Sequence, residues 1–262
     1  MNWLNHKITF LVLAVGFAFV GCKTSSMRSV QPGSVFYQDK LEAIDEAINR
    51  AIAVGKAPGA VVRIESGGAV YQKSFGLKSV KPESVPMTDD TIFDSASLTK
   101  VIATTPAIML LVERGKLRLG DKVNRWIPGF EAHGKGAVTV RHLLTHTSGV
   151  SYGTGPASDR WESAGIQGWY FADREEPVGD TIARLAALPF DAHPGEQWIY
   201  GYSIDILGAL IEAVSGQPLD EFLRTRIFDP LGMEDTHFYL PFDKRDRLAT
   251  VYSATNDGLE RA

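Results

Sequence analysis

TIFDSASLTK, residues 91–100, is the stretch from which both the fold and the candidate chemistry can be predicted. It runs into residues 101–112, which are apolar on nearly every side and are therefore predicted to form a buried helix. Ser97 would lie at the start of that helix, and Lys100, three residues further on, would share its face. A serine becomes a good nucleophile when a neighbouring base takes its proton, and lysine is such a base when burial or a nearby cation lowers its pKa. The stretch therefore predicts a nucleophile–base pair.

The spacing between these two residues is weak evidence by itself. With 17 Ser and 12 Lys in 262 residues, chance gives roughly one Ser-x-x-Lys pair, and this chain contains one. The surrounding sequence must therefore carry the interpretation.

The composition is that of an ordinary globular protein with a sizeable core, because 44% of the 262 residues are hydrophobic and 22% are charged. The net charge of -4 gives no electrostatic reason to expect nucleic acid as a partner, so a small molecule is the expected ligand. Cys22 is the only cysteine, which excludes a disulfide within the chain.

Residues 1–21 are predicted to be a secretory signal peptide, because Lys7 precedes an apolar run over residues 8–20 that is too short for a comfortable membrane span. The sequence FVGC at residues 19–22 resembles the lipobox of bacterial lipoproteins, with Phe in place of the usual Leu, and Cys22 would then be lipidated. A plain signal peptide or an uncleaved anchor is the alternative. Residues 22–38 are rich in Ser, Gly and Pro and are predicted to be a tether. Export, as a periplasmic or membrane-anchored protein, is expected.

The pattern after the tether predicts a helix followed by a hairpin. Apolar residues recur on one face of the helix, at Leu41, Ile44, Ile48 and Ile52. Gly55 can end this helix. Residues 60–65 and 69–75 are predicted to be two strands joined at Gly67-Gly68, and residues 78–90 are predicted to be a loop.

The rest of the chain is predicted to be mainly helical. Pro106 cannot donate a hydrogen bond to the carbonyl of Ile102, so a kink is expected inside the helix of residues 101–112. Thr139 can cap a short helix, and Asp180 can cap another that runs through residue 188. Two further helices are predicted over residues 203–214 and 218–228.

Residues 151–176 form an irregular stretch that is rich in Trp, Tyr and Gly. Its aromatic residues could line a pocket, namely Tyr152, Trp161, Trp169 and Tyr170. A surface lid with a few packed aromatic residues is the equal alternative.

Four stretches, taken together, resemble the serine β-lactamase and penicillin-binding-protein superfamily. SLTK at residues 97–100 resembles its first motif, and PGEQWIYGYSIDILG at residues 194–208 resembles the region of its second. Residues 115–130 and 138–150 are similar to the segments that follow the first motif in class C-type members. The resemblance implies an α+β fold, in which an antiparallel sheet flanked by helices is interrupted by a helical subdomain and the site lies between the two parts. It also implies that residues 39–262 are an incomplete domain, with the third motif beyond residue 262.

The resemblance assigns roles to individual residues. It makes Ser97 the nucleophile, Lys100 its proton acceptor, and Tyr200 the residue that carries the proton to the leaving group. Tyr202 stands where Asn is usual, which is more similar to family VIII carboxylesterases than to typical β-lactamases. Tyr202 is also a rival to Tyr200 as the catalytic tyrosine, but its distance to Leu207-Gly208 is shorter than the spacing in the family. Tyr202 and Tyr152 are the expected substrate-binding residues. The backbone N–H of Ser97 can donate to the oxyanion, and the chemistry needs no metal or other cofactor.

The implied reaction is acyl transfer from an ester or amide to the serine, followed by hydrolysis. Esterase, β-lactamase and D-alanyl-D-alanine carboxypeptidase activities all remain open, with a slight preference for esters. A non-catalytic envelope protein that binds ligands with the same fold is the alternative from another class. Because no third motif is visible before residue 262, the tail after Pro241 is expected to be poorly anchored and the polypeptide to show little turnover.

Two other patterns compete for a functional role. His142 and His146 stand four residues apart and could face one metal ion, but no third ligand has a telling spacing. Residues 149–153 fit Gly-x-Ser-x-Gly, the nucleophile elbow of α/β-hydrolases, in which Ser151 would be the nucleophile and His193 or His237 would complete the triad. The elbow needs a strand before it and a helix after it, which the sequence does not predict.

Overall fold

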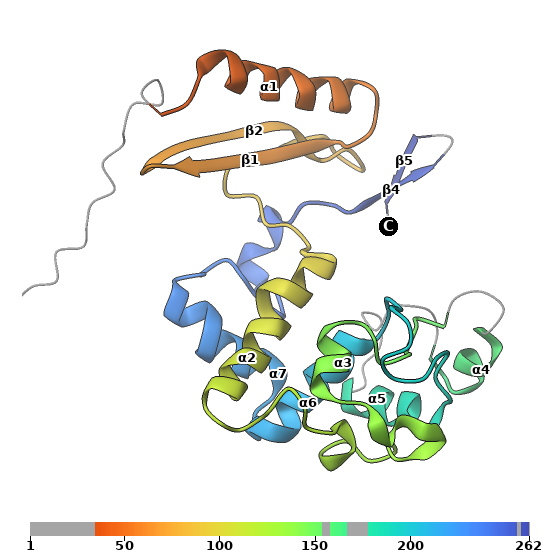
Figure 1. Ribbon diagram of the computed structural model, residues 1–262. Coiled ribbons are helices and arrows are strands. Elements are labelled where there is room, and N and C mark those ends of the chain that lie inside the picture. The colour runs from red at the N-terminus through yellow and green to blue at the C-terminus, as the bar shows by residue number, and fades with distance from the viewer. Residues whose placement is uncertain (1–34, 154–157, 167–177, 256–257, 262) are drawn as a thin grey trace, which may run out of the picture. The chain divides into compact units, whose positions relative to one another are not determined.

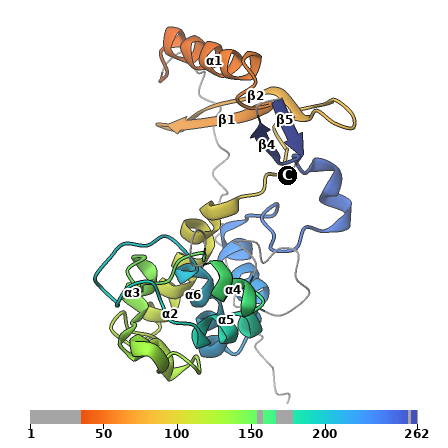
Figure 2. The ribbon, with the colours of Figure 1, turned by 90° about the vertical axis from the view of Figure 1, so that its right-hand side faces the viewer.

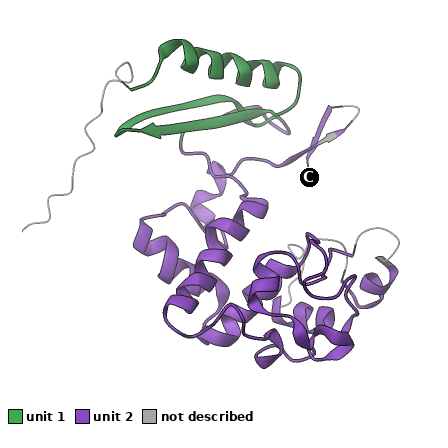
Figure 3. Cartoon of the chain, in the orientation of Figure 1, with its two compact units in different colours: residues 1–80, 85–89 green, residues 81–84, 90–262 purple. Residues whose placement is uncertain are grey.

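The computed structural model describes residues 35–153, 158–166, 178–255 and 258–261. The predicted signal peptide, Cys22 and most of the tether lie outside the described residues, as do Trp169 and Tyr170 of the aromatic stretch. The chain forms two compact units (Figure 3). Unit 1 contains residues 1–80 and 85–89, and unit 2 contains residues 81–84 and 90–262.

Unit 1 is a helix packed on a small antiparallel sheet. Helix α1 (Gln38–Ala53) lies along the hairpin of β1 (Gly59–Ser66) and β2 (Ala69–Ser79), as Figure 1 shows. The pairing of Ser66 with Ala69 leaves Gly67 and Gly68 as a two-residue turn, and both have positive φ, at 55° and 80°. A turn of this kind requires positive φ at both positions, which is why two glycines predict it correctly.

The predicted loop over residues 78–90 is wrong in one respect, because it contains the short strand β3 (Val85–Pro86). This strand pairs antiparallel with β2 and completes a three-stranded sheet in the order β1-β2-β3. Proline lacks the N–H that a central strand needs, but an edge strand tolerates it. The pairing is therefore set by the neighbouring strand rather than by a local signal.

Unit 2 begins its helical part at the predicted nucleophile. A 3₁₀ turn (η2, Ala96–Leu98) leads into a π-helical turn (η3, Lys100–Thr104), and this continues as α2 (Thr105–Glu113). Pro106 lies in the first turn of α2, where a missing N–H is tolerated. The predicted break in the helix is therefore present, but it takes the form of a wider turn before the proline rather than a kink inside one helix.

Helix α6 (Ser203–Ser215) is the centre of unit 2. It packs against α2, α3 (Val140–Leu144), α5 (Val178–Ala187) and α7 (Leu219–Leu223). The first three of these helices are labelled around α6 in Figure 2, and α7 is labelled in Figure 1. Four of its side chains have no exposed surface, namely Ile206, Leu207, Leu210 and Ile211. Gly216 ends the helix in the left-handed conformation, with φ of 71°, as its place after the last apolar residue predicts.

The remaining elements of unit 2 are short. They are η4 (Val123–Arg125), η5 (Ala132–Ala137), α4 (Ser158–Ser163), η6 (Arg224–Phe228), η7 (Asp229–Leu231), η8 (Phe242–Arg247), β4 (Tyr252–Thr255) and β5 (Gly258–Arg261). Asp180 lies in the first turn of α5 instead of preceding the helix as predicted.

The start of α3 accounts for one of the two histidines considered as metal ligands. The Thr139 hydroxyl accepts a hydrogen bond from the His142 backbone N–H at 3.3 Å, and the Thr139 N–H donates to His142 Nδ1 at 3.2 Å. The predicted cap is therefore confirmed, and the His142 side chain takes the place that Glu or Gln has in a capping box. No cluster of three His, Cys, Asp or Glu that could hold a metal occurs among the described residues.

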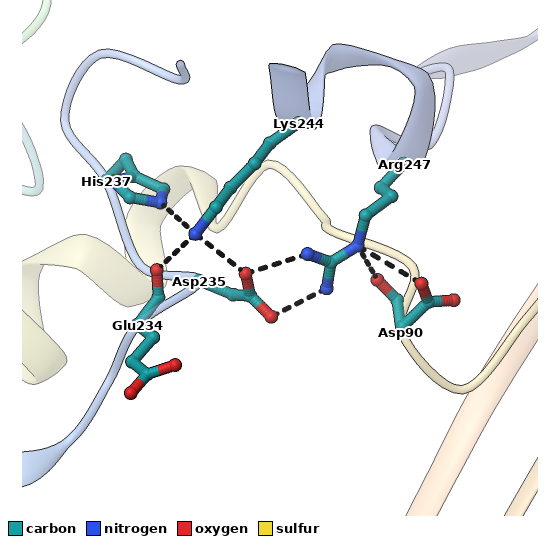
Figure 4. A network of polar contacts seen from close by, with 6 residues as sticks. All are labelled: Asp90, Glu234, Asp235, His237, Lys244 and Arg247. Carbon is teal, nitrogen blue, oxygen red and sulfur yellow. Dashed lines mark hydrogen bonds and ion pairs between the residues drawn. The ribbon is translucent and has the colours of Figure 1, made fainter. Parts of the chain in front are cut away.

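The prediction that the tail after Pro241 is poorly anchored is wrong as far as residue 252. Arg247 donates to both carboxylate oxygens of Asp235, at 2.8 and 2.6 Å, and to the carbonyl of Asp90 at 2.8 Å (Figure 4). Ile92 donates to the carbonyl of Arg247 at 2.9 Å, and Ala249 donates back to Ile92 at 2.8 Å. The contacts of Asp90 and Ile92 with residues 247–249 join segments that are more than 150 residues apart, which no local sequence pattern reveals.

Candidate active site

Ser97 and Lys100 lie together, as their spacing predicts. Lys100 Nζ donates a hydrogen bond to Ser97 Oγ at 3.1 Å. The residue before the serine, Ala96, has a φ of 41°, which is strained for a side chain with a Cβ, and its N–H donates to the Asp94 carboxylate at 2.7 Å. Strain of this kind persists where the surrounding structure fixes it, and it gathers at functional sites. The serine is exposed, so its hydroxyl is accessible.

Two tyrosines complete this cluster. Lys100 Nζ lies 4.9 Å from the centroid of the Tyr200 ring and 5.9 Å from that of Tyr152. The two rings meet edge to face, with centroids 5.6 Å apart. The Tyr200 hydroxyl also interacts with Ser97. Ser97, Lys100, Tyr152 and Tyr200, from three separate segments, therefore form one cluster.

The electrostatics of Lys100 differ from what the sequence argument required. Burial lowers the pKa of Lys100, but hydrogen bonds with Tyr200 and Tyr152, together with the charge of Asp205, outweigh it and leave this pKa above its usual value. Burial alone would raise the pKa of Tyr200, yet its hydrogen bonds with Ser97 and Lys100 bring this pKa below its usual value. The site therefore favours a protonated Lys100 and a more acidic Tyr200, the reverse of a lysine poised as a base.

Tyr202 is not placed to bind substrate, which corrects the prediction. Its side chain has no exposed surface and packs on Tyr152, with centroids 4.8 Å apart, and on Trp161 at 5.9 Å. Tyr200, in contrast, is 38% exposed. Tyr202 therefore supports Tyr152 from within the core, and of the two rivals only Tyr200 adjoins the serine.

Gly201 stands between these two tyrosines in a space too small for a side chain. A Cβ at this position would lie 2.5 Å from the carbonyl oxygen of Val150 and 2.5 Å from the carbonyl carbon of Ser151. The segment of Tyr200 therefore presses directly on the backbone of the segment that leads to Tyr152.

His146 is a member of the site that the sequence reasoning did not assign to it. Its ring lies 4.7 Å from that of Tyr200 and 6.0 Å from that of Trp198, centroid to centroid. Its backbone has a φ of 55°, and its carbonyl accepts a hydrogen bond from Ile199 at 2.8 Å. Burial and the charge of Lys100 lower the pKa of His146, which keeps the ring neutral.

Asp205 is the second member that was missed. It lies in the first turn of α6, and α6 packs on the turn that carries Lys100. Part of the residue remains accessible, but its Oδ2 is buried and has no hydrogen-bond partner in the part of the chain that the structure describes. Burial raises the pKa of Asp205 to about 6, although the charge of Lys100 lowers it. No motif spacing in the amino-acid sequence predicts that Asp205 belongs to the site.

Ser151 lacks the surroundings of a nucleophile elbow. Its Oγ accepts a hydrogen bond from the Gly153 N–H at 3.0 Å, and residues 151–153 are irregular. The preceding element is the helix α3 rather than a strand. His237, one of its possible partners, contacts Lys244 instead. The alternative that relied on Ser151 therefore has no structural support.

Comparison with known proteins gives a consistent answer. The family model described as Beta-lactamase matches residues 44–262. The chain is 36% identical over 205 residues to Esterase EstB of Burkholderia gladioli, covering 74% of this chain and 50% of that protein. It is 29% identical over 242 residues to a putative D-alanyl-D-alanine carboxypeptidase of Escherichia coli (strain K12), covering 87% and 54%.

Among solved structures, EstCE1, described as a hydrolase with promiscuous acyltransferase activity, matches with a TM-score of 0.75 and 31% identity over 86% of this chain and 59% of that one. The chain thus spans about half the length of the curated relatives it matches. These comparisons confirm the predicted superfamily and the α+β fold: the chain belongs to the β-lactamase family.

Proposed function

We propose that this chain carries the nucleophile of a serine hydrolase that works through a covalent acyl-enzyme. The single observation that supports it best is the 3.1 Å hydrogen bond from Lys100 Nζ to Ser97 Oγ, with Tyr200 beside the same hydroxyl. A nucleophile within hydrogen-bond reach of its activating groups is the arrangement that covalent catalysis requires.

The directions of the pKa shifts suggest which group takes the proton. Tyr200, as a phenolate, accepts the proton of Ser97, while Lys100 remains an ammonium that stabilises the phenolate. Ser97 Oγ then attacks the acyl carbonyl, and the Ser97 backbone N–H is one donor to the resulting oxyanion. Tyr200 returns the proton to the leaving group as the bond to it breaks. Water, activated by the same phenolate, hydrolyses the acyl-enzyme and restores the serine.

Esters with an apolar or aromatic part are the proposed substrates. Tyr152 and the 68% exposed Trp198 each contact the ring of Tyr200 and offer aromatic surface near the serine. The buried Tyr202 supplies none of the hydrogen bonding to a substrate amide that Asn would give. The name of the Burkholderia relative, Esterase EstB, agrees with this preference. β-Lactam and D-alanyl-D-alanine substrates are the alternatives to be measured.

A fluorescent fluorophosphonate tests the proposed nucleophile without requiring turnover. We expect the wild-type chain and Ser151→Ala to be labelled equally and Ser97→Ala not to be labelled. Labelling that survives in Ser97→Ala and is lost in Ser151→Ala would contradict the proposal. An absence of labelling in the wild-type chain would instead favour a ligand-binding protein of the same fold.

Parallel assays address the substrate class. We expect hydrolysis of p-nitrophenyl butyrate to exceed that of nitrocefin and of a D-alanyl-D-alanine peptide, each corrected for the rate of Ser97→Ala. Faster turnover of nitrocefin or of the peptide would overturn the preference for esters.

We also propose that the chain is exported and anchored through Cys22, on the support of residues 1–22 of the sequence alone. Metabolic labelling with palmitate in a bacterial host should mark the wild-type protein and not Cys22→Ser. Equal labelling of both would exclude a lipid at this position.

A further inference from the structure

Asp205 has a buried carboxylate oxygen on a helix that packs against the turn of Lys100. It lies in the first turn of α6, which packs on the π-helical turn of Lys100. Its Oδ2 is shielded from solvent and lacks a hydrogen-bond partner within the described ranges. Leaving a buried carboxylate oxygen unpaired costs free energy, so its presence calls for an explanation.

Two ionisable groups from other segments interact electrostatically with this carboxylate. Lys100, on the turn η3, lowers the pKa of Asp205, and the pKa of Tyr152 rises in part because of Asp205. Within α6 the carboxylate interacts with its own backbone N–H. Lys100 is thus the one cation that acts on Asp205 among the described residues.

Stabilisation of the helix start does not explain the burial. An acidic residue in a first turn interacts favourably with the helix dipole, but an exposed one does so as well. Asp180 occupies the first turn of α5 and is exposed. What distinguishes Asp205 from Asp180 is therefore the burial of its Oδ2 and its electrostatic interaction with Lys100 rather than its place in a helix.

We propose that Asp205 is a positioning residue for Lys100. Its buried negative charge adds to the hydrogen bonds of Tyr200 and Tyr152 in keeping Lys100 an ammonium beside Ser97 Oγ, and so favours the Tyr200 phenolate over the lysine amine as the base. This inference rests on the proposed function, because it assigns the proton transfers of that same site. Burial and the charge of Lys100 lower the pKa of His146 and keep its ring neutral, so it adds no second positive charge beside Lys100.

The protonation of Asp205 supports this assignment. Burial raises its pKa to about 6, so the carboxylate is charged above that pH and its influence is lost below it. The groups that face the site from the surrounding segments are Lys100, Tyr152, Tyr200 and His146. Lys100 should therefore respond at the pH where Asp205 titrates, a behaviour that an isolated lysine lacks.

The test compares Asp205→Asn with Asp180→Asn in the full-length chain. Lysine labelled with ¹³C at Cε is followed by NMR from pH 4 upward, and Lys100→Met assigns the Lys100 signal. We expect Lys100 in Asp205→Asn to lose its proton at lower pH than in the wild-type chain, and Asp180→Asn to leave this titration unchanged. The rate of fluorophosphonate labelling should fall at high pH, where Lys100 loses its proton. In Asp205→Asn this fall should begin at a lower pH than in the wild-type chain.

An unchanged Lys100 titration in a folded Asp205→Asn would overturn the inference. If that variant does not fold, the wild-type chain still decides, because its Lys100 signal should show a second inflection near the pH at which the Asp205 carboxyl titrates, and a single inflection would overturn the inference. Failure of the proposed function has a different signature, since Ser97→Ala would then be labelled like the wild-type chain whatever Lys100 does.

Discussion

Unit 2 contains two clusters of charge that are built in opposite ways. In the first, the Arg247 network of Asp90, Asp235, Lys244 and Arg247, the charged side chains are in ion-pair contact and solvent reaches them; Asp235 is 50% exposed and Arg247 is 28% exposed (Figure 4). In the second, Lys100 interacts electrostatically with Asp205, whose Oδ2 is buried and unpaired among the described residues.

The difference teaches what each cluster is for. Exposed ion pairs contribute little stability one by one, but a bidentate arginine with well-defined geometry fixes the path of the chain, here from Asp235 to the segment before Ser97. A buried charge without full compensation costs stability, and shifted pKa values gather at functional sites. The first cluster therefore has a structural role, and the second is a candidate for chemistry.

Replacing one lysine from each cluster should give the largest contrast. Lys100→Met removes the ammonium that stabilises the Tyr200 phenolate, so the fluorophosphonate labelling rate at Ser97 should fall by about 10²- to 10⁴-fold. Lys244→Met should leave that rate unchanged, because Lys244 contacts Glu234, Asp235 and His237, none of which belongs to the candidate site. Equal losses in the two variants would remove the distinction between the clusters.

A second contrast concerns stability and its pH dependence. The folded-state pKa of Asp205, about 6, lies above its ordinary value of 3.8, so the folded chain binds this proton more tightly than the unfolded one and stability falls as pH rises from about 4 to about 6. The difference corresponds to about 3 kcal/mol. Asp205→Asn should therefore be more stable than wild type by up to about 3 kcal/mol above pH 6 and not below pH 4.

Urea unfolding of Asp205→Asn and wild type at the two ends of this range measures the effect, with Asp180→Asn as the control that should show no such gain. A gain of the same size at both pH values would mean that the carboxylate charge is not its cause. A gain at high pH together with an altered Lys100 titration would be the signature of a charge retained for function at the expense of stability.

The smallest effect is expected in the Arg247 network. Arg247→Met removes the bidentate pair with Asp235 and should lower the melting temperature by less than Asp205→Asn raises it at pH 8. Because these charges are exposed, the loss should shrink between low salt and roughly 1 M salt. Thermal scans of this variant and of Arg226→Met, an exposed arginine of η6, check this. A decrease in melting temperature that does not depend on salt would indicate that Arg247 stabilises the fold through packing rather than through its charge.

Local signals explain what could be predicted from the sequence. Gly67-Gly68 demands a turn with positive φ, Thr139 offers a side-chain acceptor to a helix start, and the three-residue spacing brings Ser97 to Lys100. Each of these features depends on residues that are close in the chain. The role of Tyr200, in contrast, could be assigned only through the resemblance to a family.

The errors and omissions share the opposite property. The anchoring of the tail depends on contacts between Arg247 and Asp90, and strand β3 depends on its partner β2. Whether Tyr202 faces the core or the site, and whether Asp205 interacts with Lys100, is decided by which side of α6 the rest of unit 2 covers. Periodicity predicts that a helix has a buried face, but it does not say which ionisable groups on neighbouring elements meet there.

The tight contact at Gly201 has a consequence for how this protein can diversify. The backbone of Val150 and Ser151 touches Gly201, so the position of the neighbouring Tyr200 phenol depends on that loop as well as on its own segment. Any side chain at position 201 would meet that backbone and displace the phenol. Saturation libraries should therefore recover many residues at Trp198 and almost only glycine at position 201.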